Sequence, residues 1–329
     1  MKLGNVGADA PILPLLRDAL LRAAIFDRRD TRPAPPLWNA VNTGEGRLAA
    51  LDFKEGTKLW SRDPLKELSG TEAEYGMASS PLVLGDQVIV TVGAEKGTLS
   101  AYDTKTGKPL WTAGHDTAGY SSPTLLTVAS KPQIVSYSGS AALGIAPQTG
   151  ALLWRYPFET NFDCNIAMPI SMKGQVLLSA GENHGSVLLE LRPQNDKFDI
   201  TEVWKSFGPK SVLRSEWQTP VLLDGYLYGM DNVGGAGPVT HLTCIDATTG
   251  KRMWQVPRFG KGNLISADGK LFMTTMAGEL VVARASSQKY DEMGRVTLLE
   301  TTRQAPSLAN GFLYLRDGRE VVCVDVRKQ

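Results

Sequence analysis

Cysteine and histidine are scarce in this sequence, and their scarcity limits the chemistry it can carry. The 329 residues include three cysteines and three histidines, and no two cysteines are adjacent or spaced as metal ligands. Cys244 and Cys323 occupy the same place in two similar segments, TCID and VCVD, so we expect buried strand cysteines rather than a redox pair. A three-histidine metal site would need His115, His184 and His241 together, and we predict no metal site.

The common catalytic motifs are absent as well. The chain has no HExxH, no phosphate-binding loop, no GxGxxG and no GxSxG elbow. These motifs mark zinc proteases, nucleotide-binding proteins and α/β-hydrolases. The sequence therefore predicts no catalytic residue from a motif.

The chain also lacks an excess of charge of one sign. It carries 35 Lys and Arg against 34 Asp and Glu. A balanced charge gives no electrostatic footprint for nucleic acid or for an anionic membrane. We expect no nucleic-acid partner.

Long uncharged apolar runs are missing too. The most apolar N-terminal stretch, residues 14–28 (PLLRDALLRAAIFDR), is interrupted by Arg17, Asp18 and Arg22. These charges exclude a transmembrane span there and make a poor signal-peptide core. The stretch predicts a short amphipathic helix inside a non-repeating segment, residues 1–45.

A repeated segment that ends in tryptophan fills most of the remaining chain. Residues 97–111, GTLSAYDTKTGKPLW, return in altered form at 46–60, 142–154 and 241–254, each with Trp four residues after a turn Gly. The chain has five tryptophans spaced by 51, 43, 50 and 50 residues, namely Trp60, Trp111, Trp154, Trp204 and Trp254. A period of about 40–50 residues made of strands is typical of propeller blades.

The residue types of one copy predict its local structure. Apolar and polar residues alternate in 99–103, as in a half-buried strand. Asp103 can accept hydrogen bonds from the next backbone amides, and Gly107 supplies the positive φ of the turn. Trp111 then lies on the second strand of a hairpin, and an indole of this kind buries about 150–250 Å². Because one sheet leaves two apolar faces uncovered, we predict that the five tryptophans dock each blade on its neighbour.

The repeats predict an all-β fold, a β-propeller of four-stranded antiparallel blades. We count five full units and two partial ones: residues 46–60, preceded only by 37–43, and residues 305–329, which lack a fourth strand. This gives about seven blade positions, or a truncated eight-bladed ring, and leaves ring closure open. The predicted propeller covers residues 46–329.

One unit departs from the repeat. In the fifth full unit, residues 263–300, we expect Leu298 or Leu299 at the position of the tryptophan.

The repeat resembles a known family. AYDTKTGKPLW and IDATTGKRMW are similar to the A-x-D-x-x-T-G-x-x-x-W repeat of PQQ-like propellers, the quinoprotein-alcohol-dehydrogenase-like superfamily, whose rings usually have eight blades. That superfamily includes PQQ-dependent dehydrogenases and BamB-like, non-enzymatic lipoproteins of the outer-membrane β-barrel assembly machinery. YSSPTL, DGYLYGMDN and GKGNLISADGKLF also resemble PQQ-like repeat proteins of planctomycete-type bacteria. The resemblance covers roughly residues 46–326 and implies the fold, whereas function has to come from a site.

A binding site is expected at one mouth of the central channel. Loops that run from the outer strand of one blade to the inner strand of the next converge there. The candidate ligand-binding residues on these loops are Glu74, Tyr75, His115, Asp116, Tyr120, Asn165, Glu216, Trp217, Lys261 and Asn263, with Asp163 and Arg214 beside them. Each also has a structural interpretation: His115 and Asp116 as a solvated turn, Glu216 as a local partner of Arg214, and Trp217 as a cap on the core. His184, in the GENHG turn, is interpreted as a loop residue.

Two functions remain open from the sequence. The first is a non-catalytic scaffold that binds a protein partner in the bacterial cell envelope; it would be a monomer without a cofactor. The resemblance implies a periplasmic or other extracytoplasmic location, and with no signal peptide visible the cytoplasm stays open.

The alternative is a PQQ-dependent oxidoreductase or small-ligand binder that uses the mouth residues. The resemblance implies PQQ between a tryptophan and a disulfide of adjacent cysteines, with Ca²⁺ held by carboxylate and Asn oxygens. The adjacent cysteines are missing here, although some soluble sugar-type quinoproteins lack them.

Overall fold

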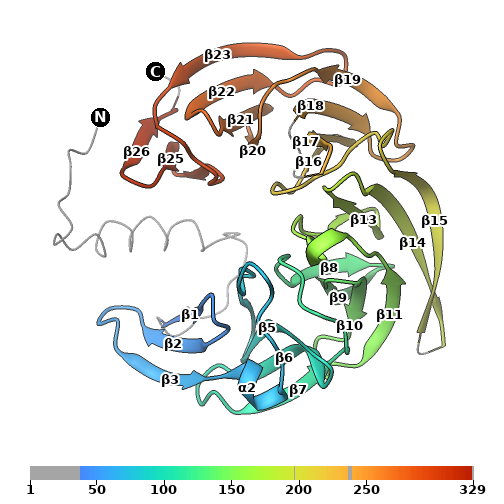
Figure 1. The fold of residues 1–329 in the computed structure, drawn as a ribbon, viewed down its shortest axis with the longest axis vertical. Coiled ribbons are helices and arrows are strands. Elements are labelled where there is room, and N and C mark those ends of the chain that lie inside the picture. The colour runs from blue at the N-terminus through green and yellow to red at the C-terminus, as the bar shows by residue number, and fades with distance from the viewer. Residues whose placement is uncertain (1–37, 196, 236–238, 328–329) are drawn as a thin grey trace.

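The computed structural model describes residues 38–195, 197–235 and 239–327, which form seven antiparallel sheets arranged in a ring (Figure 1). Five sheets have four strands, and the first and the last have three. In each sheet the strands follow one another in chain order, from the centre of the ring to its outside (Figure 1). The all-β propeller with about seven blade positions is therefore confirmed. The helix predicted at 14–28 lies outside the described residues.

The first three sheets span the N-terminal half of the described chain. The first contains β1 (Trp38–Asn42), β2 (Leu48–Asp52) and β3 (Lys58–Arg62). The second contains β4 (Leu82–Leu84), β5 (Gln87–Ala94), β6 (Gly97–Asp103) and β7 (Pro109–Ala113). The third contains β8 (Thr124–Val128), β9 (Lys131–Tyr137), β10 (Ala141–Ile145) and β11 (Leu152–Pro157).

Four further sheets complete the ring. The fourth contains β12 (Ile170–Met172), β13 (Gln175–Ala180), β14 (Gly185–Gln194) and β15 (Lys197–Phe207). The fifth contains β16 (Val221–Leu223), β17 (Tyr226–Val233), β18 (Val239–Asp246) and β19 (Arg252–Val256). The sixth contains β20 (Gly262–Ala267), β21 (Lys270–Thr275), β22 (Glu279–Arg284) and β23 (Asp291–Thr297). The last contains β24 (Ser307–Ala309), β25 (Phe312–Arg316) and β26 (Val321–Asp325).

The two short sheets lack strands at opposite positions. β3 carries Trp60 and is the outer strand of the first sheet, so that sheet lacks an inner strand. β24, β25 and β26 are the inner three strands of the last sheet, which lacks an outer strand as predicted. Within the described ranges no strand of the first sheet pairs with a strand of the last.

The hydrophobic core is divided into layers between successive sheets. The described residues form six apolar clusters, one for each pair of neighbouring sheets from the first to the last. In the layer between the second and third sheets, for example, Leu99 and Ala101 pack with Leu143 and Ile145, all of them fully buried. Each sheet thus gains its apolar cover from its neighbours rather than from a separate layer of helices.

The repeat tryptophans reach into these layers. The Nε1 of Trp60 donates a hydrogen bond to the carbonyl of Thr104 (2.9 Å), and the indole lies against Gly107 in the next sheet. Trp204 lies in the same way against Gly250 and donates to the carbonyl of Ala247 (3.0 Å).

The other three indoles make related contacts. Trp111 lies against Gly150 of the third sheet, and Trp254 donates to the carbonyl of Ser286 in the sixth (2.7 Å). Trp154 is only 4% exposed and packs in the layer between the third and fourth sheets, while its Nε1 donates to Gln133 of its own sheet (2.7 Å).

A β-bulge accompanies the tryptophan position in every complete sheet. The pairing register shifts next to the residue that faces the tryptophan, as at Ala101 opposite Trp111. In the sixth sheet the equivalent pair is Val282 and Gly294. The expectation that Leu298 or Leu299 stands at the tryptophan position is therefore wrong: residues 285–290, between β22 and β23, contain no turn glycine from which the position could be counted, and both leucines follow the end of β23.

A short helix, α2 (Pro64–Leu68), follows the first sheet and was not predicted. Asp63 caps it by accepting a hydrogen bond from the amide of Lys66 (3.2 Å), and Pro64 occupies its first turn. Asp followed by Pro is a helix-start signal. The helix packs Leu65 on the layer between the first and second sheets.

Candidate functional site

The predicted mouth residues lie on loops between an outer strand and the next inner strand, except Asn263, which lies in β20, and several of them hold these loops in place. Asp116, after β7, is buried and forms an ion pair with Arg155 of the third sheet (Nη2–Oδ1 2.5 Å). It also accepts a hydrogen bond from Ser140 (2.6 Å). Burial alone would raise the pKa of Asp116, but the bonds from Arg155 and Ser140 outweigh it and hold the pKa below its ordinary value. Asp116 is thus not a solvated turn residue, whereas His115 beside it is exposed.

Asn165 is fully buried and forms hydrogen bonds with backbone groups of several loops. Its side-chain amide donates to the carbonyls of Ser138 (2.7 Å) and Phe158 (3.0 Å). Its own carbonyl accepts from the amides of Tyr120 (3.0 Å) and Ser121 (2.9 Å). With these contacts Asn165 joins the loops after β7, β9 and β11.

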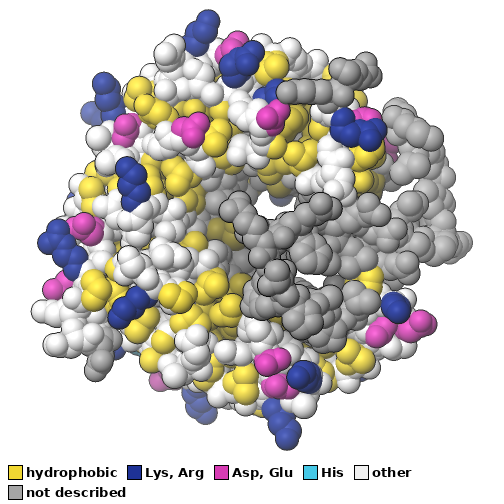
Figure 2. Space-filling model, turned by 180° about the vertical axis from the view of Figure 1, so that it is seen from behind, with side chains coloured by type: hydrophobic (Ala, Val, Ile, Leu, Met, Phe, Trp, Pro, Cys, Tyr) yellow, Lys and Arg dark blue, Asp and Glu magenta, His cyan; other side chains and the backbone are white. Residues whose placement is uncertain are grey.

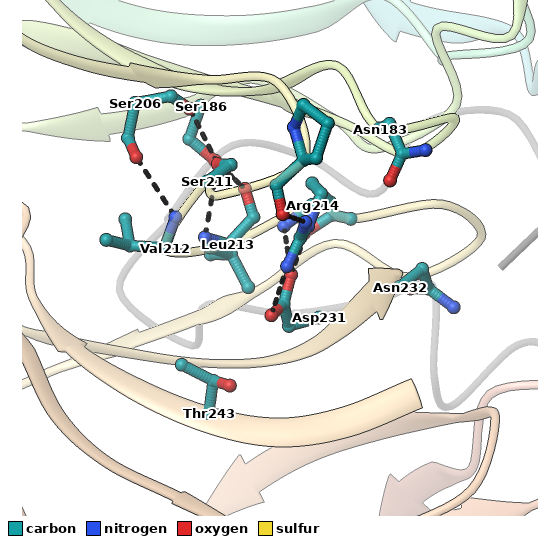
Figure 3. Close-up of polar contacts among 12 residues, drawn as sticks. Asn183, Ser186, Ser206, Ser211, Val212, Leu213, Arg214, Asp231, Asn232 and Thr243 are labelled. Atoms are coloured by element: carbon teal, nitrogen blue, oxygen red, sulfur yellow. Dashed lines mark hydrogen bonds and ion pairs between the residues drawn. The ribbon is translucent and has the colours of Figure 1, made fainter. Parts of the chain in front are cut away.

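The loop that leads to β16 is anchored by a buried ion pair. Figure 3 shows the side chains of Arg214 and Asp231 pointing toward each other, with Nε–Oδ1 at 2.7 Å and Nη2–Oδ2 at 2.8 Å. Arg214 is 3% exposed and Asp231 is fully buried. The Nη1 of Arg214 also donates to the carbonyl of Pro209 (2.6 Å). The interpretation that Arg214 pairs with Glu216 is therefore wrong.

Glu216 pairs with Lys261 instead. The Nζ of Lys261, between β19 and β20, lies 3.1 Å from Oε1 of Glu216. The carboxylate is 5% exposed, and its Oε2 has no hydrogen-bond partner within the described part of the chain. Burial raises the pKa of Glu216 above its ordinary value, although the ammonium of Lys261 opposes this effect.

Trp217 lies beneath two cations. The Nζ of Lys261 is 4.1 Å and the Cζ of Arg303 is 4.7 Å from the centre of its ring. The side chain of Asn263 donates to the carbonyl of Arg303 (2.9 Å), which ties the loop before β24 to this group. Glu216, Trp217, Lys261 and Asn263 are thus brought together as predicted for one mouth, with Arg303 as an addition.

Tyr75 and Tyr120 form a second group. Their rings are 6.0 Å apart, and the hydroxyl of Tyr120 accepts a hydrogen bond from the amide of Tyr75 (3.2 Å). Tyr75 is 64% exposed. The carboxylate of Glu74 raises the pKa of Tyr75.

His184 lies among aromatic rings. Its ring centre lies 4.2 Å from that of Phe158, after β11, and 5.0 Å from that of Phe207, at the end of β15, and both ring pairs are tilted. Burial lowers its pKa. His184 is a loop residue, as interpreted, in a turn that packs against the outer-strand ends. His115 lies on the loop after β7, whereas His241 lies in β18, where its Nδ1 accepts a hydrogen bond from the amide of Arg258 (2.9 Å).

Sequence reasoning missed several residues of this region. Arg155, Asp231 and Arg303 come from strands and loops of other sheets, so no local pattern marks them as partners of mouth residues.

The described residues do not fit PQQ with Ca²⁺. The ring of Trp217, the tryptophan among the predicted mouth residues, already lies under Lys261 and Arg303. The amides of Asn165 and Asn263 are bonded to backbone carbonyls. In the described ranges no three His, Cys, Asp or Glu side chains are grouped so that they could hold a metal ion.

Among the described residues visible on the back of the ring, no large patch of one charge is seen. In Figure 2, Lys and Arg side chains alternate with Asp and Glu around this face. No helix in the described ranges has the length and apolar character to span a membrane.

Comparison with known proteins gives consistent matches. The sequence matches the family described as outer membrane protein assembly factor BamB over residues 33–256 and 238–328. Outer membrane protein assembly factor BamB of Yersinia pestis is 20% identical over 295 residues, 86% of this chain and 71% of that protein. Quinohemoprotein alcohol dehydrogenase ADH IIB of Pseudomonas putida is 41% identical over 78 residues, 22% of this chain and 10% of that protein.

A solved structure has the same fold. BamB from Moraxella catarrhalis superposes with a TM-score of 0.64 at 15% identity, covering 88% of this chain and 81% of that one. At this identity the likeness shows the fold alone.

Proposed function

This chain belongs to the family of outer membrane protein assembly factor BamB, and from that membership we propose that it is a non-catalytic propeller scaffold that presents its channel mouth to a protein partner in the bacterial cell envelope. The family match extends over nearly all of the described residues. The relative from Yersinia pestis is named as an assembly factor for outer membrane proteins.

The observation that supports a scaffold most directly is that polar mouth residues are already bonded to other groups of the protein. Asp116 and Arg214 are bound in ion pairs, and Asn165 is bound to backbone. A reaction centre needs an acid, base or nucleophile held free to meet a substrate. At the mouth, these side chains instead hold the loops in place, and Tyr75 is exposed. Aromatic side chains such as that of Tyr75 are enriched in protein interfaces.

Photo-crosslinking tests the proposal. A photoreactive residue in place of Tyr75 is expected to capture an envelope protein from a membrane-enriched extract. The same residue in place of Leu110, which is 49% exposed on the outer strand β7, serves as the control. Equal adducts from both positions, or no adduct from Tyr75, would contradict a partner at the mouth.

We also propose that the protein acts as a monomer outside the cytoplasm. Light scattering of the purified protein is expected to give the mass of one chain, and a dimer mass would contradict this. Cell fractionation is expected to recover the protein with periplasmic or membrane-associated markers.

A quinone-dependent oxidoreductase is the second candidate, favoured by the 78-residue segment that is 41% identical to a quinohemoprotein dehydrogenase. Titration with PQQ and Ca²⁺, followed by absorption spectra and dye reduction, separates the two candidates. A saturable quinone spectrum with turnover would favour the enzyme and contradict the scaffold.

A further inference from the structure

The first and the last sheet each have one face that no described sheet covers. The six apolar layers join the seven sheets in order, and within the described ranges none lies between the last sheet and the first. The two sheets stand at the two ends of the ring in Figure 1. Every other sheet is covered on both faces, so the propeller pattern is incomplete at these two faces.

The uncovered face of the last sheet is mostly apolar. Leu313 and Val322 point into the layer with the sixth sheet. Because successive side chains of a strand point to opposite faces, their sequence neighbours lie on the uncovered face, where Tyr314 stands opposite Cys323 in the register. The aromatic and apolar residues of this face, all partly buried, are Phe312, Tyr314, Val321 and Cys323. We call these four residues the open face.

The first sheet has a smaller apolar surface on its uncovered side. Ala40 and Leu48 point into the layer with the second sheet. This leaves Val41 and Ala49, which are paired in the register, on the other side together with Leu51. None of these three side chains is aromatic. The open face of the last sheet is therefore the surface that gains most from apolar cover.

The part of the chain that precedes β1 has a composition and an attachment point that suit this cover. Residues 1–37 end where β1 begins, in the first sheet. In the helix that the sequence predicts there, Leu16 and Leu20 share one side and Asp18 lies on the opposite side. The nine residues 29–37 can span about 30 Å when extended. A tether of this length at one end of the ring raises the local concentration of the segment at the other end.

We propose that residues 14–28 pack Leu16 and Leu20 on the open face of the last sheet and so join the two ends of the ring. The favourable free energy comes from apolar burial, which needs no hydrogen-bond partner. The segment is then an internal ligand of the propeller, attached to the first sheet and bound to the last. This inference stands on the fold and does not depend on the proposed scaffold function.

Cross-linking within the full chain tests the inference. Cys323 belongs to the open face and is partly exposed, whereas Cys244 is buried. In a Cys164→Ser background, Leu16→Cys and Leu20→Cys are each treated with a short bismaleimide, and the linked peptides are identified by mass spectrometry. A link to Cys323 within one chain is expected from both positions, and Cys323→Ser is expected to abolish it.

Asp18→Cys is the matched control, because it lies between the two leucines in the sequence but on the opposite side of the predicted helix. It is expected to give no link to Cys323. Equal yields from the three positions, or no link from either leucine position, overturn the inference. A link between two chains, seen as a dimer mass, shows that a second copy covers the open face and overturns the inference as well.

The reactivity of Cys323 gives a second measurement that does not depend on the reach of a cross-linker. Leu20→Asp places a charge against the open face, and burial of an unpaired charge is unfavourable. The segment is therefore expected to detach, with alkylation of Cys323 by iodoacetamide about tenfold faster than in the wild type. Asp18→Asn is expected to leave this rate unchanged. Both substitutions lie outside the seven sheets, and an unchanged rate in Leu20→Asp overturns the inference.

Discussion

At the scale of one residue, Glu216 is a mouth residue whose buried carboxylate is unfavourable for the stability of the fold. Its carboxylate is buried, one oxygen has no donor, and the ammonium of Lys261 compensates only in part. Residues kept at a cost to folding are typical of functional positions. We make two single-residue predictions for charged side chains that are buried near the loop leading to β16.

Replacement of Glu216 with Gln is expected to raise the melting temperature at pH 7.5. The folded pKa of Glu216 lies above the unfolded value of about 4.3, so its charged form destabilises the fold at neutral pH. That penalty disappears as the pH falls through the folded pKa, and the two melting temperatures should converge near pH 4. Lys261, Glu182 and Arg303 are the charged groups that act on it.

The control for this measurement is Glu300→Gln, which removes an exposed partner of Arg319. It should leave the melting temperature unchanged. A lower melting temperature for Glu216→Gln at pH 7.5 would mean that the pair with Lys261 outweighs burial.

Asp231→Asn is expected to lower the free energy of unfolding by about 3–5 kcal/mol, the usual effect of removing one partner of a buried ion pair. Arg214 would stay buried opposite a neutral amide. Denaturant unfolding measures the loss. Asp268→Asn, where Lys270 faces a carboxylate that is 74% exposed, should change stability by less than about 1 kcal/mol. Similar losses in both variants would contradict the anchoring role of Arg214 and Asp231.

At the scale of the element, the turn between the third and fourth strands of a blade contains a glycine. This glycine allows the backbone turn and can also leave room for a tryptophan of the preceding sheet. Gly56 and Gly107 occupy the same turn position and both have a φ of +67°. A Cβ at Gly107 would lie 2.7 Å from Trp60 of the preceding sheet, whereas a Cβ at Gly56 would meet nothing within 4 Å. Comparing Gly56 with Gly107 therefore separates the effect of the positive φ from the effect of the contact with the indole.

Gly107→Ala is therefore expected to destabilise the protein by about 1–3 kcal/mol more than Gly56→Ala, through overpacking against the indole. Denaturant midpoints of both variants give the difference. Combining each with Trp60→Ala should abolish that difference, because the cavity removes the clash. Equal losses in the two glycine variants would show that Trp60 does not dock on this turn.

Local patterns predicted these elements only in part. Strand alternation and the Asp–Gly turn are set by neighbouring residues, so β6, β7 and their hairpin could be read from residues 97–111. The connection between β22 and β23, residues 285–290, has no turn glycine, so local spacing could not locate Gly294 opposite Val282.

At the scale of the whole molecule, each sheet is covered by its neighbours. Six apolar layers join the seven sheets in order, as in other repeat proteins whose stability comes from nearest-neighbour interfaces. The mouth residues come from segments of several sheets and are brought together only when these sheets stand in a ring. The sequence could predict which loops converge there, whereas the pairs Asp116–Arg155 and Arg214–Asp231 depend on tertiary geometry.

Hydrogen–deuterium exchange of the full chain, with and without the partner captured at Tyr75, tests most directly whether the mouth is a protein-binding face. The account predicts slower exchange on binding in residues 74–80, 161–165 and 211–218, and no change in the hairpin turns at 52–56 and 103–107. Protection confined to those turns, with unchanged exchange at the mouth, would contradict it.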